Sequence, residues 1–320
     1  MRRTFLNAAA AMLLACAISS VTAQTYPAKT VRGIVSFGVG GQTDAAARIL
    51  AQKLSERWGQ PFVIENRVGA NGNVGTEAAV KSPADGYTLL VTTQTLTLNR
   101  VLFASPAFEP LRDLAPISLI GVSDFVLVVH PSVPAQTVSE LISYVKANPQ
   151  KLVYGATSFQ GEFIMELFNN LAGIRIERIP YTAMANLQAD LVAGRVTTLF
   201  TPPRAVIGHI QAGKLRALAV SGAKPMPMLP GVPSIKPVLP NLEATTWYAV
   251  LAPSKTPAEL IARLNAEFKW AIEQPDVRQR LEQVGIDARH SSPEELRDLL
   301  RKDVDMIEDL VRRGVMKISG

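Results

Sequence analysis

The glycine-rich stretch Ser36–Asp44, with the sequence SFGVGGQTD, is the first segment whose residue types and spacing suggest chemistry. A strand-like run, Thr30–Val35, precedes it, and a helical run begins at Ala45. This order of strand, glycine-rich turn and helix directs free backbone N–H groups, and the positive end of the helix dipole, toward a bound anion. We therefore expect this stretch to bind a small acid, and proline at Gly41 to abolish binding by removing an N–H and forcing φ.

A second segment of the same kind is Tyr154–Gly161, which reads YGATSFQG and leads from a strand-like run into a helical one. Gly155 and Gly161 allow the backbone to bend, and Thr157 and Ser158 offer hydroxyl donors. A single glycine-rich turn is more often ordinary turn chemistry. Two such turns, one from each half of the molecule, would bind a dicarboxylate or a carboxylate with a polar tail.

Polar side chains at the ends of two other strand-like runs are candidate lining of the same site. Thr92 and Thr93 lie at the carboxyl end of one run, where open α/β sheets place their ligands. Tyr181 follows a later run and occupies an equivalent place in the second half of the molecule. These three residues therefore join the two loops in the predicted site.

Two features near the first loop favour structural roles. A free carboxylate beside an anion site would repel the ligand, so we expect Asp44 to cap the following helix and pair with Arg48 one turn on. The loop Gly69–Gly75 leaves two interpretations open. It either closes the floor of the cleft or forms a tight turn with an asparagine cap.

The sequence offers no catalytic or metal-binding constellation. Its three histidines, His130, His209 and His290, are far apart and match no metal spacing. It has no Gly-x-Ser-x-Gly elbow, and Gly38–Gly41 lacks the endings of the dinucleotide and P-loop fingerprints. We therefore expect neither an enzyme nor a bound metal or cofactor.

The N-terminal segment has the three parts of a secretory signal. Two arginines follow the initiating methionine, Ala8–Ile18 is apolar but too short to span a bilayer, and small residues up to Ala23 form a cleavage site. We expect residues 1–23 to be a signal peptide and the mature chain to be periplasmic. Export by the twin-arginine route and lipoprotein processing at Cys16 stay open as alternatives. Cleavage near Ala23 would remove the only cysteine, and with it any disulfide.

The charge pattern excludes one class of partner. The formal net charge is +6, and it falls to about +4 once the two arginines of the signal are removed. The remaining charges alternate in sign and form no basic block, so we expect no nucleic-acid partner. No apolar run after the signal is long enough for a transmembrane helix.

Short apolar runs alternate with helical patterns along almost the whole chain, which is typical of an α/β protein. Capping boxes predict helix starts at Thr137, Thr256 and Ser292, the last two with proline at the first helical position. One expected helix, Ala45–Trp58, has an apolar face. The runs predicted to form strands are Thr30–Phe37, Phe62–Asn66, Tyr87–Thr92, Ile117–Gly121, Phe125–His130, Leu152–Gly155, Ile174–Ile179, Val196–Phe200, Leu215–Val220 and Thr246–Leu251.

Two places suggest that the chain crosses between lobes. Around Gly121–Phe125 one strand-like run follows another directly, and the proline-rich segment Ser221–Asn241 precedes the run Thr246–Leu251. Two crossings that return the chain to its first lobe would give a bilobed molecule with a central ligand cleft. Helices from Thr256 onward would then pack on the first lobe. The predicted lobes are residues 24–122 plus 246–320 and residues 123–245.

Several different short motifs follow one another along the chain after the signal. They are Tyr26–Lys29, Phe37, Gly40–Arg48, Gly59–Pro61, Glu65–Arg67, Gly69–Gly75, Ser82–Leu90, Ile179–Tyr181, Ala212–Ala219, Leu229–Pro233 and Trp247–Pro253. With these motifs the chain resembles the Bug-type receptors, the extracytoplasmic solute-binding proteins of tripartite tricarboxylate transporters. So many ordered matches are more specific than any single glycine-rich loop.

This resemblance implies a two-lobed, type II periplasmic-binding-protein fold that closes on its ligand by a hinge. It implies that the two loops bind a small mono- or dicarboxylic acid, largely through backbone N–H groups and bridging water. It also implies delivery to the membrane subunits of a tripartite transporter, and we expect a monomer. Together with the strand-end residues, the candidate ligand-binding residues are Phe37, Gly38, Gly40, Gly41, Gln42, Thr43, Thr92, Thr93, Ala156, Thr157, Ser158, Gln160, Gly161 and Tyr181.

The second loop departs from the family pattern, which reads Tyr-Gly-Ser-x-Gly-x-Gly-Ser and then has a histidine three residues on. This chain has Ala156, Ser158, Gln160, Gly161 and Ile164 at the positions that differ. A lost hydroxyl at Ala156 and an added amide at Gln160 would change the ligand. One function of another class stays open: a sensing module that closes on a ligand and signals to a partner protein.

Overall fold

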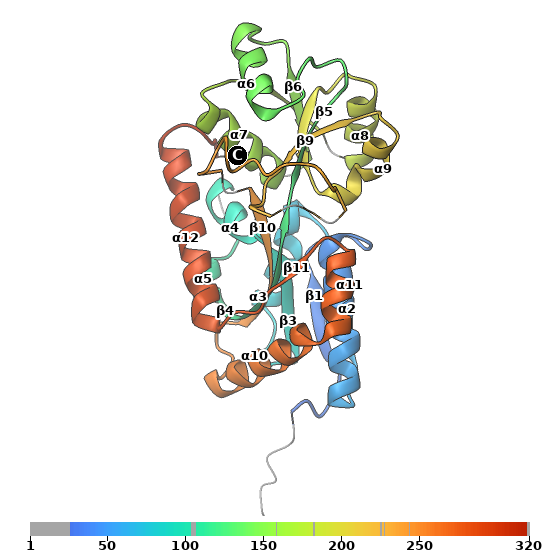
Figure 1. The fold of residues 1–320 in the computed structure, drawn as a ribbon. Coiled ribbons are helices and arrows are strands. Elements are labelled where there is room, and N and C mark those ends of the chain that lie inside the picture. Colours follow the sequence, from blue (N-terminus) through green and yellow to red (C-terminus); the bar gives the residue numbers. More distant parts are fainter. Residues whose placement is uncertain are drawn as a thin grey trace, which may run out of the picture.

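The computed structural model describes residues 26–103, 107–157, 159–181, 183–224, 226, 228–242 and 244–318. Two β-sheets, each covered by helices, form the two lobes of a mixed α/β fold (Figure 1). The predicted α/β class and two-lobed fold are therefore confirmed. The predicted signal peptide, Cys16 and the candidate residue Ser158 lie outside the described residues.

The first sheet has six strands in the order β11-β4-β10-β3-β1-β2. β1 pairs in parallel with β2 and β3, whereas β10 runs antiparallel between β3 and β4. The side chains of β1 at Val31, Ile34 and Val35 are fully buried, as expected for a central parallel strand covered on both faces. The strands are β1 (Val31–Val35), β2 (Phe62–Asn66), β3 (Thr88–Thr93), β4 (Leu114–Asp124), β10 (Thr245–Pro253) and β11 (Asp287–Ala288).

Helices from both ends of the chain cover the first sheet. Apolar residues of α2 and α10 share one core cluster with β1, and residues of α3 and α4 share a second cluster with β3 and β10. The helices of this lobe are α2 (Gln42–Trp58), the 3-10 turn η1 (Ala70–Gly72), α3 (Asn73–Val80), α4 (Thr95–Leu102), α5 (Pro110–Asp113), α10 (Ala258–Glu273) and α11 (Pro275–Gln283).

The second sheet has five strands in the order β7-β6-β8-β5-β9. β5 lies antiparallel between β8 and β9, and β6 runs parallel to β7 and β8. Its strands are β5 (Val126–Val129), β6 (Val153–Ala156), β7 (Glu177–Pro180), β8 (Thr198–Thr201) and β9 (Arg216–Val220). Its helices are α6 (Val138–Ala147), α7 (Phe159–Ala172), α8 (Met184–Val192), η2 (Pro203–Ala205) and α9 (Ile207–Gln211).

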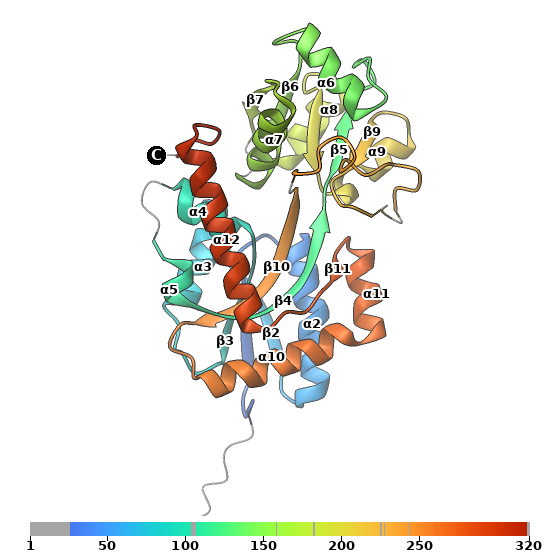
Figure 2. The ribbon, with the colours of Figure 1, turned by 60° about the vertical axis from the view of Figure 1, so that its left-hand side comes forward.

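The two crossings between the sheets lie side by side. β4 ends at Asp124, and β5 of the second sheet begins at Val126. The return strand β10 begins at Thr245, which pairs with Asp124. Figure 2 shows β4 and β10 running together from the first sheet toward the second. The two lobes are therefore connected by a pair of adjacent strands, β4 and β10.

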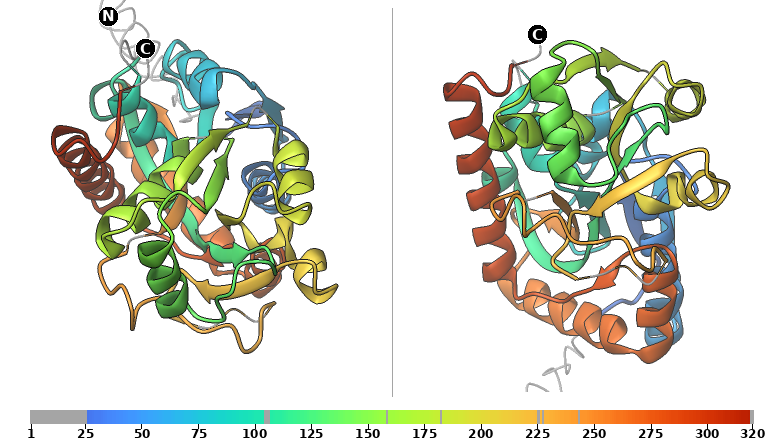
Figure 3. Two further views of the ribbon diagram at one scale, coloured as in Figure 1. Left: turned by 90° about the horizontal axis from the view of Figure 1, so that it is seen from above. Right: turned by 45° about the horizontal axis from the view of Figure 1, so that its top comes forward.

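The last helix, α12 (Pro293–Arg312), packs on the first lobe, as expected for the helices from Thr256 onward. It also reaches the second lobe, which the sequence did not predict. Its first half contributes Leu296 and Leu300 to a core with Trp247 of the first sheet. Its second half contributes Val304, Ile307 and Leu310 to a cluster that contains much of α7. Twenty residues span about 30 Å, which is enough to reach past the first lobe. Figure 3 shows α12 alongside both lobes.

All ten predicted strands are present with ends shifted by a few residues, and the two-residue β11 was missed. Ser292 and Glu295 form the predicted capping box. Thr137 accepts the N–H of Glu140 at 3.2 Å. The box at Thr256 is wrong, because its hydroxyl donates to Pro253 O at 2.8 Å and the helix has Pro257 at its N-cap.

Two kinds of feature are absent from the described residues. In that part of the chain, no helix combines the length and apolar character needed to cross a bilayer. The same residues contain no cluster of three histidine, cysteine or acidic side chains suited to a metal ion.

Candidate functional site

A cavity of about 180 Å³ lies between the two lobes. The first lobe contributes the loop after β1, the first turn of α2, the end of β3 and the start of β10. The second lobe contributes the loop after β6, the first turn of α7, part of α8 and the end of β8. The lining residues are Phe37, Gln42, Thr43, Thr93, Phe125, Gly155, Ala156, Thr157, Gln160, Gly161, Met184, Leu187, Leu199, Phe200, Thr201, Pro202, Thr246 and Tyr248.

The cavity brings together part of the predicted site. Eight predicted residues line it: Phe37, Gln42, Thr43, Thr93, Ala156, Thr157, Gln160 and Gly161. The lining does not include five others: Gly38, Gly40, Gly41, Thr92 and Tyr181. The two glycine-rich loops therefore meet across the cavity, but the middle of the first loop lies outside its wall.

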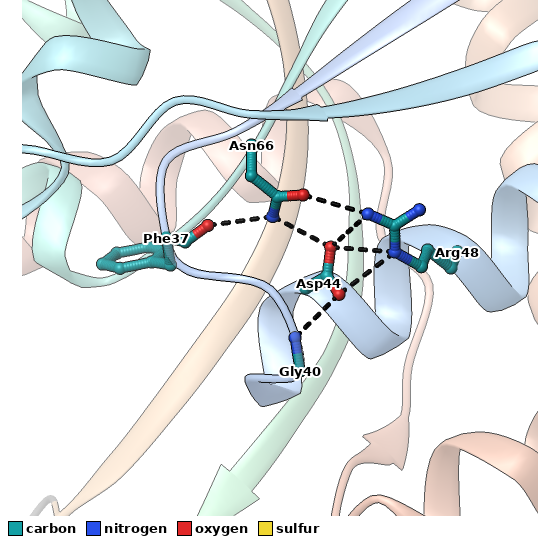
Figure 4. Close-up of polar contacts among 5 residues, drawn as sticks. All are labelled: Phe37, Gly40, Asp44, Arg48 and Asn66. Carbon is teal, nitrogen blue, oxygen red and sulfur yellow. Dashed lines mark hydrogen bonds and ion pairs between the residues drawn. The ribbon is translucent and has the colours of Figure 1, made fainter. Parts of the chain in front are cut away.

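An internal carboxylate holds the first loop. Asp44, which has a buried side chain, accepts the backbone N–H of Gly40 at 3.0 Å (Figure 4). It also accepts hydrogen bonds from Arg48 Nε at 3.0 Å and from Asn66 Nδ2 at 2.9 Å. The expected pairing with Arg48 is present, but Gly41 is the N-cap of α2 and Asp44 lies in the first turn. The N–H of Gly40 is thus used within the protein.

The ionised form of Asp44 is favoured despite its burial. Burial alone would raise the pKa of this carboxyl. The hydrogen bonds from Arg48, Gly40 and Asn66, with the nearby charge of Arg48, outweigh that effect and hold the pKa below its ordinary value. Asn66 Nδ2 also donates to Phe37 O at 2.9 Å, so the same cluster fixes the backbone where the loop leaves β1.

The first turn of α2 supplies backbone donors at the cavity wall. The first hydrogen bond of the helix runs from Ala45 N–H to Gly41 O, so the N–H groups of Gln42 and Thr43 precede the helical ladder. The Gln42 side chain is committed elsewhere. Its Nε2 donates to Val284 O at 2.8 Å, and its Oε1 accepts from the Tyr248 hydroxyl at 3.1 Å.

The two strand-end threonines differ in position. Thr93 lines the cavity, and its hydroxyl is 3.0 Å from the Thr95 hydroxyl and accepts the Thr95 N–H at 3.3 Å. It therefore also helps to start α4. Thr92 is buried and pairs with Ala249 of β10 outside the cavity wall.

In the second loop, close packing requires a glycine at position 155. A Cβ at Gly155 would lie 2.0 Å from Leu187 Cδ1, and both residues line the cavity. Tyr181 supports this region from behind. Its N–H donates to Ala156 O at 2.9 Å, and its hydroxyl donates to Asp190 Oδ2 at 2.6 Å. Tyr181 thus fixes the loop from outside the wall.

Two buried polar atoms of lining residues have no hydrogen-bond partner among the described residues. They are Gln160 Oε1 and Thr201 Oγ1, and these two residues are 8% and 1% exposed. Buried polar groups are nearly always satisfied, so each such atom points to a missing partner. Both residues line the cavity, which is where a ligand would supply that partner.

Sequence reasoning missed the lining residues of β8, α8 and β10. Thr201 and Pro202 follow a predicted strand at its carboxyl end, which is the signal that selected Thr93, so they could have been found in the same way. Thr246 and Tyr248 lie on the return strand beside the crossing, and nothing in the sequence places that strand against the loops.

The loop Gly69–Gly75 is structural in this fold. It contributes no residue to the cavity lining. Asn99 Nδ2 donates to Asn71 O at 2.9 Å and to Asn73 Oδ1 at 2.7 Å, which joins the start of α3 to α4. A Cβ at Gly75 would lie 2.8 Å from both Arg67 O and Ser36 Cα. The loop is therefore a tight turn, but the asparagine cap is wrong, because the N-cap of α3 is Gly72 and no side chain caps that helix.

The wall of the cavity is electrically neutral in its side chains. None of the lining residues that the structure describes has a side chain that is charged at neutral pH. An anion there would be stabilised by backbone N–H groups, hydroxyls and the positive ends of α2 and α7.

Residues 46–314 match the family of tripartite tricarboxylate transporter receptors (TctC). Protein BugT of Bordetella pertussis is 34% identical over 304 residues, which covers 93% of each chain. The structure of R. palustris Rpa4515 with adipate has a TM-score of 0.79 and 32% identity, covering 90% of this chain and 97% of its own. MatC from Rhodopseudomonas palustris with bound malate has a TM-score of 0.76 and 28% identity, covering 89% and 100%.

Proposed function

The chain belongs to the family of tripartite tricarboxylate transporter receptors, and we propose that it binds a small carboxylate in the cavity between its lobes. Family members are periplasmic solute-binding receptors and not enzymes, as the sequence motifs indicated. The carboxylate class is supported by two similar structures, one with adipate and one with malate.

One observation carries the proposal: the first turns of two long helices meet across a cavity whose wall is otherwise neutral. Gln42 and Thr43 come from α2, and Gln160 and Gly161 come from α7. The N-terminus of a helix offers unpaired N–H groups and about half a positive charge, both of which favour an anion. The two lobes thus provide complementary halves of one anion site.

Binding in this cavity requires that each carboxylate oxygen find neutral donors. Burying a carboxylate without hydrogen bonds would cost several kcal/mol of binding free energy. The number of carboxylate groups that a ligand can carry is therefore limited by the donors in the cavity. The hydroxyls of Thr157 and Thr201 add to the backbone donors of the two helices. This arrangement favours a small acid over a larger polyanion.

We propose further that the receptor is exported by its N-terminal signal, with cleavage near Ala23, and delivers its ligand to transporter membrane subunits. The predicted lobes, residues 24–122 plus 246–320 and residues 123–245, would close on the ligand about the paired strands β4 and β10. Thr92, Gly38, Gly40, Gly41 and Tyr181 would support the site from outside its wall.

The test is a thermal-shift and calorimetric screen of the purified protein against aliphatic, aromatic and hydroxylated mono- and dicarboxylates. A ligand that binds only the folded state raises the melting temperature in a concentration-dependent way. The matching amides, which keep the size but lose the charge, serve as controls. A shift with acids and none with amides supports the proposal. No shift with any carboxylate would contradict it.

A further inference from the structure

We propose that Gln160 determines ligand specificity: its side-chain carbonyl accepts a hydrogen bond from a neutral O–H or N–H donor on the bound acid. This inference rests on the proposed function and narrows the ligand to acids that carry such a donor. Four observations support it: the orientation of the Gln160 amide, the burial of its oxygen, the neutral wall and the position of Thr201.

The orientation of the Gln160 amide is set by a chain of buried side chains. Gln160 Nε2 donates to Gln94 Oε1 at 3.1 Å, across the two lobes. An interaction with the Gln94 amide lowers the pKa of the Asp303 carboxyl on α12, so the NH₂ group of Gln94 faces Asp303 and its oxygen faces Gln160. Trp247 Nε1 donates to Asp303 Oδ2 at 2.6 Å and anchors the far end of the chain.

The contacts from Asp303 through Gln94 prevent the Gln160 amide from rotating by 180°. If it did, its carbonyl would face the carbonyl of Gln94, and a buried acceptor pair would replace a hydrogen bond. The Nε2 atom therefore stays on Gln94, and Oε1 is left on the other side of the group. The asymmetry of Gln160 is thus imposed from Asp303 through Gln94.

The Oε1 atom of Gln160 is buried and has no partner among the described residues, although the residue lines the cavity. A carbonyl oxygen accepts hydrogen bonds and cannot donate one. A carboxylate oxygen of the ligand therefore cannot satisfy it, whereas a hydroxyl or an amide N–H of the ligand can. An acid with no such group would leave the oxygen unsatisfied, at a cost to affinity.

The neutral wall selects among possible donors. An ammonium group would satisfy Oε1 but would enter a cavity whose described lining offers no carboxylate to pair with it. A hydroxyl or amide carries no net charge and needs no such partner. A neutral donor is therefore preferred over an amino acid.

Thr201 provides the complementary contact from the end of β8. Thr201 is 1% exposed, and its buried hydroxyl has no partner among the described residues and can donate to a carboxylate oxygen. Gln160 and Thr201 both belong to the second lobe and line the same cavity. Together they bind two groups of one small molecule: Thr201 donates to its carboxylate, and Gln160 accepts from its hydrogen-bond donor.

The experiment compares matched pairs of acids by calorimetry on the purified protein: malate with succinate, and lactate with propionate. The wild type is expected to bind the hydroxy member of at least one pair tenfold or more tightly. Gln160→Met keeps the side chain's length but removes the acceptor, so the ratio should fall to near one through weaker binding of the hydroxy acid. Gln136→Met, at an exposed position of the same lobe, is the matched control and should keep the wild-type ratio.

The outcomes separate this inference from the proposed function. If the wild type binds carboxylates without preferring the hydroxy member of either pair, the role of Gln160 is wrong and the receptor function stands. Retention of the wild-type ratio by a folded Gln160→Met variant would overturn the inference in the same way. Because the wild-type ratio needs no variant, poor folding of Gln160→Met leaves the first comparison decisive. Absence of binding to every acid would instead contradict the proposed function.

Discussion

Asp44 accepts the backbone N–H of Gly40 at 3.0 Å, so the first glycine-rich loop is held by an anion that belongs to the protein. The same carboxylate binds Arg48 and Asn66, and Asn66 continues to Phe37 O. This cluster sets the path of the loop before any ligand arrives (Figure 4). The donors left for the ligand are those of the first turn of α2.

Asp44→Ala is expected to destabilise the protein by about 1–3 kcal/mol, because it leaves the Gly40 N–H without its acceptor and removes one of the two acceptors of Asn66 Nδ2. Urea unfolding at neutral pH measures the change. Glu56→Ala, at an exposed position of the same helix, is the control and should shift stability by less than about 0.5 kcal/mol. Equal effects of the two substitutions would mean that the cluster does not stabilise the loop.

The contribution of Asp44 to stability is expected to disappear in acid. Its pKa is lowered in the folded state, so the unfolded state takes up the proton first as pH falls. The stabilisation is complete above the unfolded pKa of about 3.9 and is lost as pH falls through the lower folded value. The difference between wild type and Asp44→Ala, measured by urea unfolding from pH 7 to pH 2, should shrink below about pH 4. A difference that stays constant to the lowest pH would contradict this.

Asp303 is expected to give the opposite pH dependence. Burial raises its pKa to about 6, although hydrogen bonds from Trp247, Gln94 and Thr97 oppose that rise. Between about pH 4 and 6 the unfolded state binds fewer protons at this group, so its contribution to stability falls as pH rises and levels off above about 6. In Asp303→Asn this fall should be absent. Urea unfolding at intervals from pH 4 to 8 makes the comparison, and parallel curves would show that Asp303 does not titrate in this window.

Gly41→Pro tests whether the backbone N–H of Gly41 in the first loop binds the ligand. The sequence alone predicts that proline would force φ there, but Gly41 has φ −71°, which proline adopts without strain. Its N–H makes only a long contact of 3.4 Å to Gly38 O, and the residue lies outside the cavity wall. We expect wild-type thermal stability and less than a tenfold loss of carboxylate affinity. A hundredfold loss at an unchanged melting temperature would instead assign the Gly41 N–H to the ligand.

The sequence predicted the parts of this fold that depend on local patterns. Strands such as Phe62–Asn66 were located by their apolar runs, and the two loops by their glycines. The Gln160–Gln94 contact was not predictable, because its partners are 66 residues apart and no periodic pattern links them. The contact of α12 with the second lobe was not predictable for a similar reason. An apolar stripe shows that a helix packs against something, but it does not show which element it packs against.

Asp303→Asn is expected to invert the polarity that Gln160 presents to the ligand. The substituted amide would still accept the Trp247 N–H through its oxygen, but its NH₂ group would then face Gln94 where a carboxylate oxygen had been. Gln94 would turn its oxygen toward that NH₂ group and its own NH₂ group toward Gln160, and Gln160 would turn in response. The NH₂ group of Gln160 would then be the group left for the ligand.

This inversion should change which acids bind. The wild type should prefer a hydroxy acid to its keto analogue, as in malate over oxaloacetate or lactate over pyruvate, and Asp303→Asn should reverse the preference by about tenfold or more. Calorimetry on both variants measures the ratios, with Asp305→Asn, at an exposed position of the same helix, as the matched control. A folded Asp303→Asn variant that keeps the wild-type preference would show that the Gln160 amide is not oriented through Gln94. Because the substitution touches no residue of the cavity wall, a reversed preference would have no simpler cause than the turned amide.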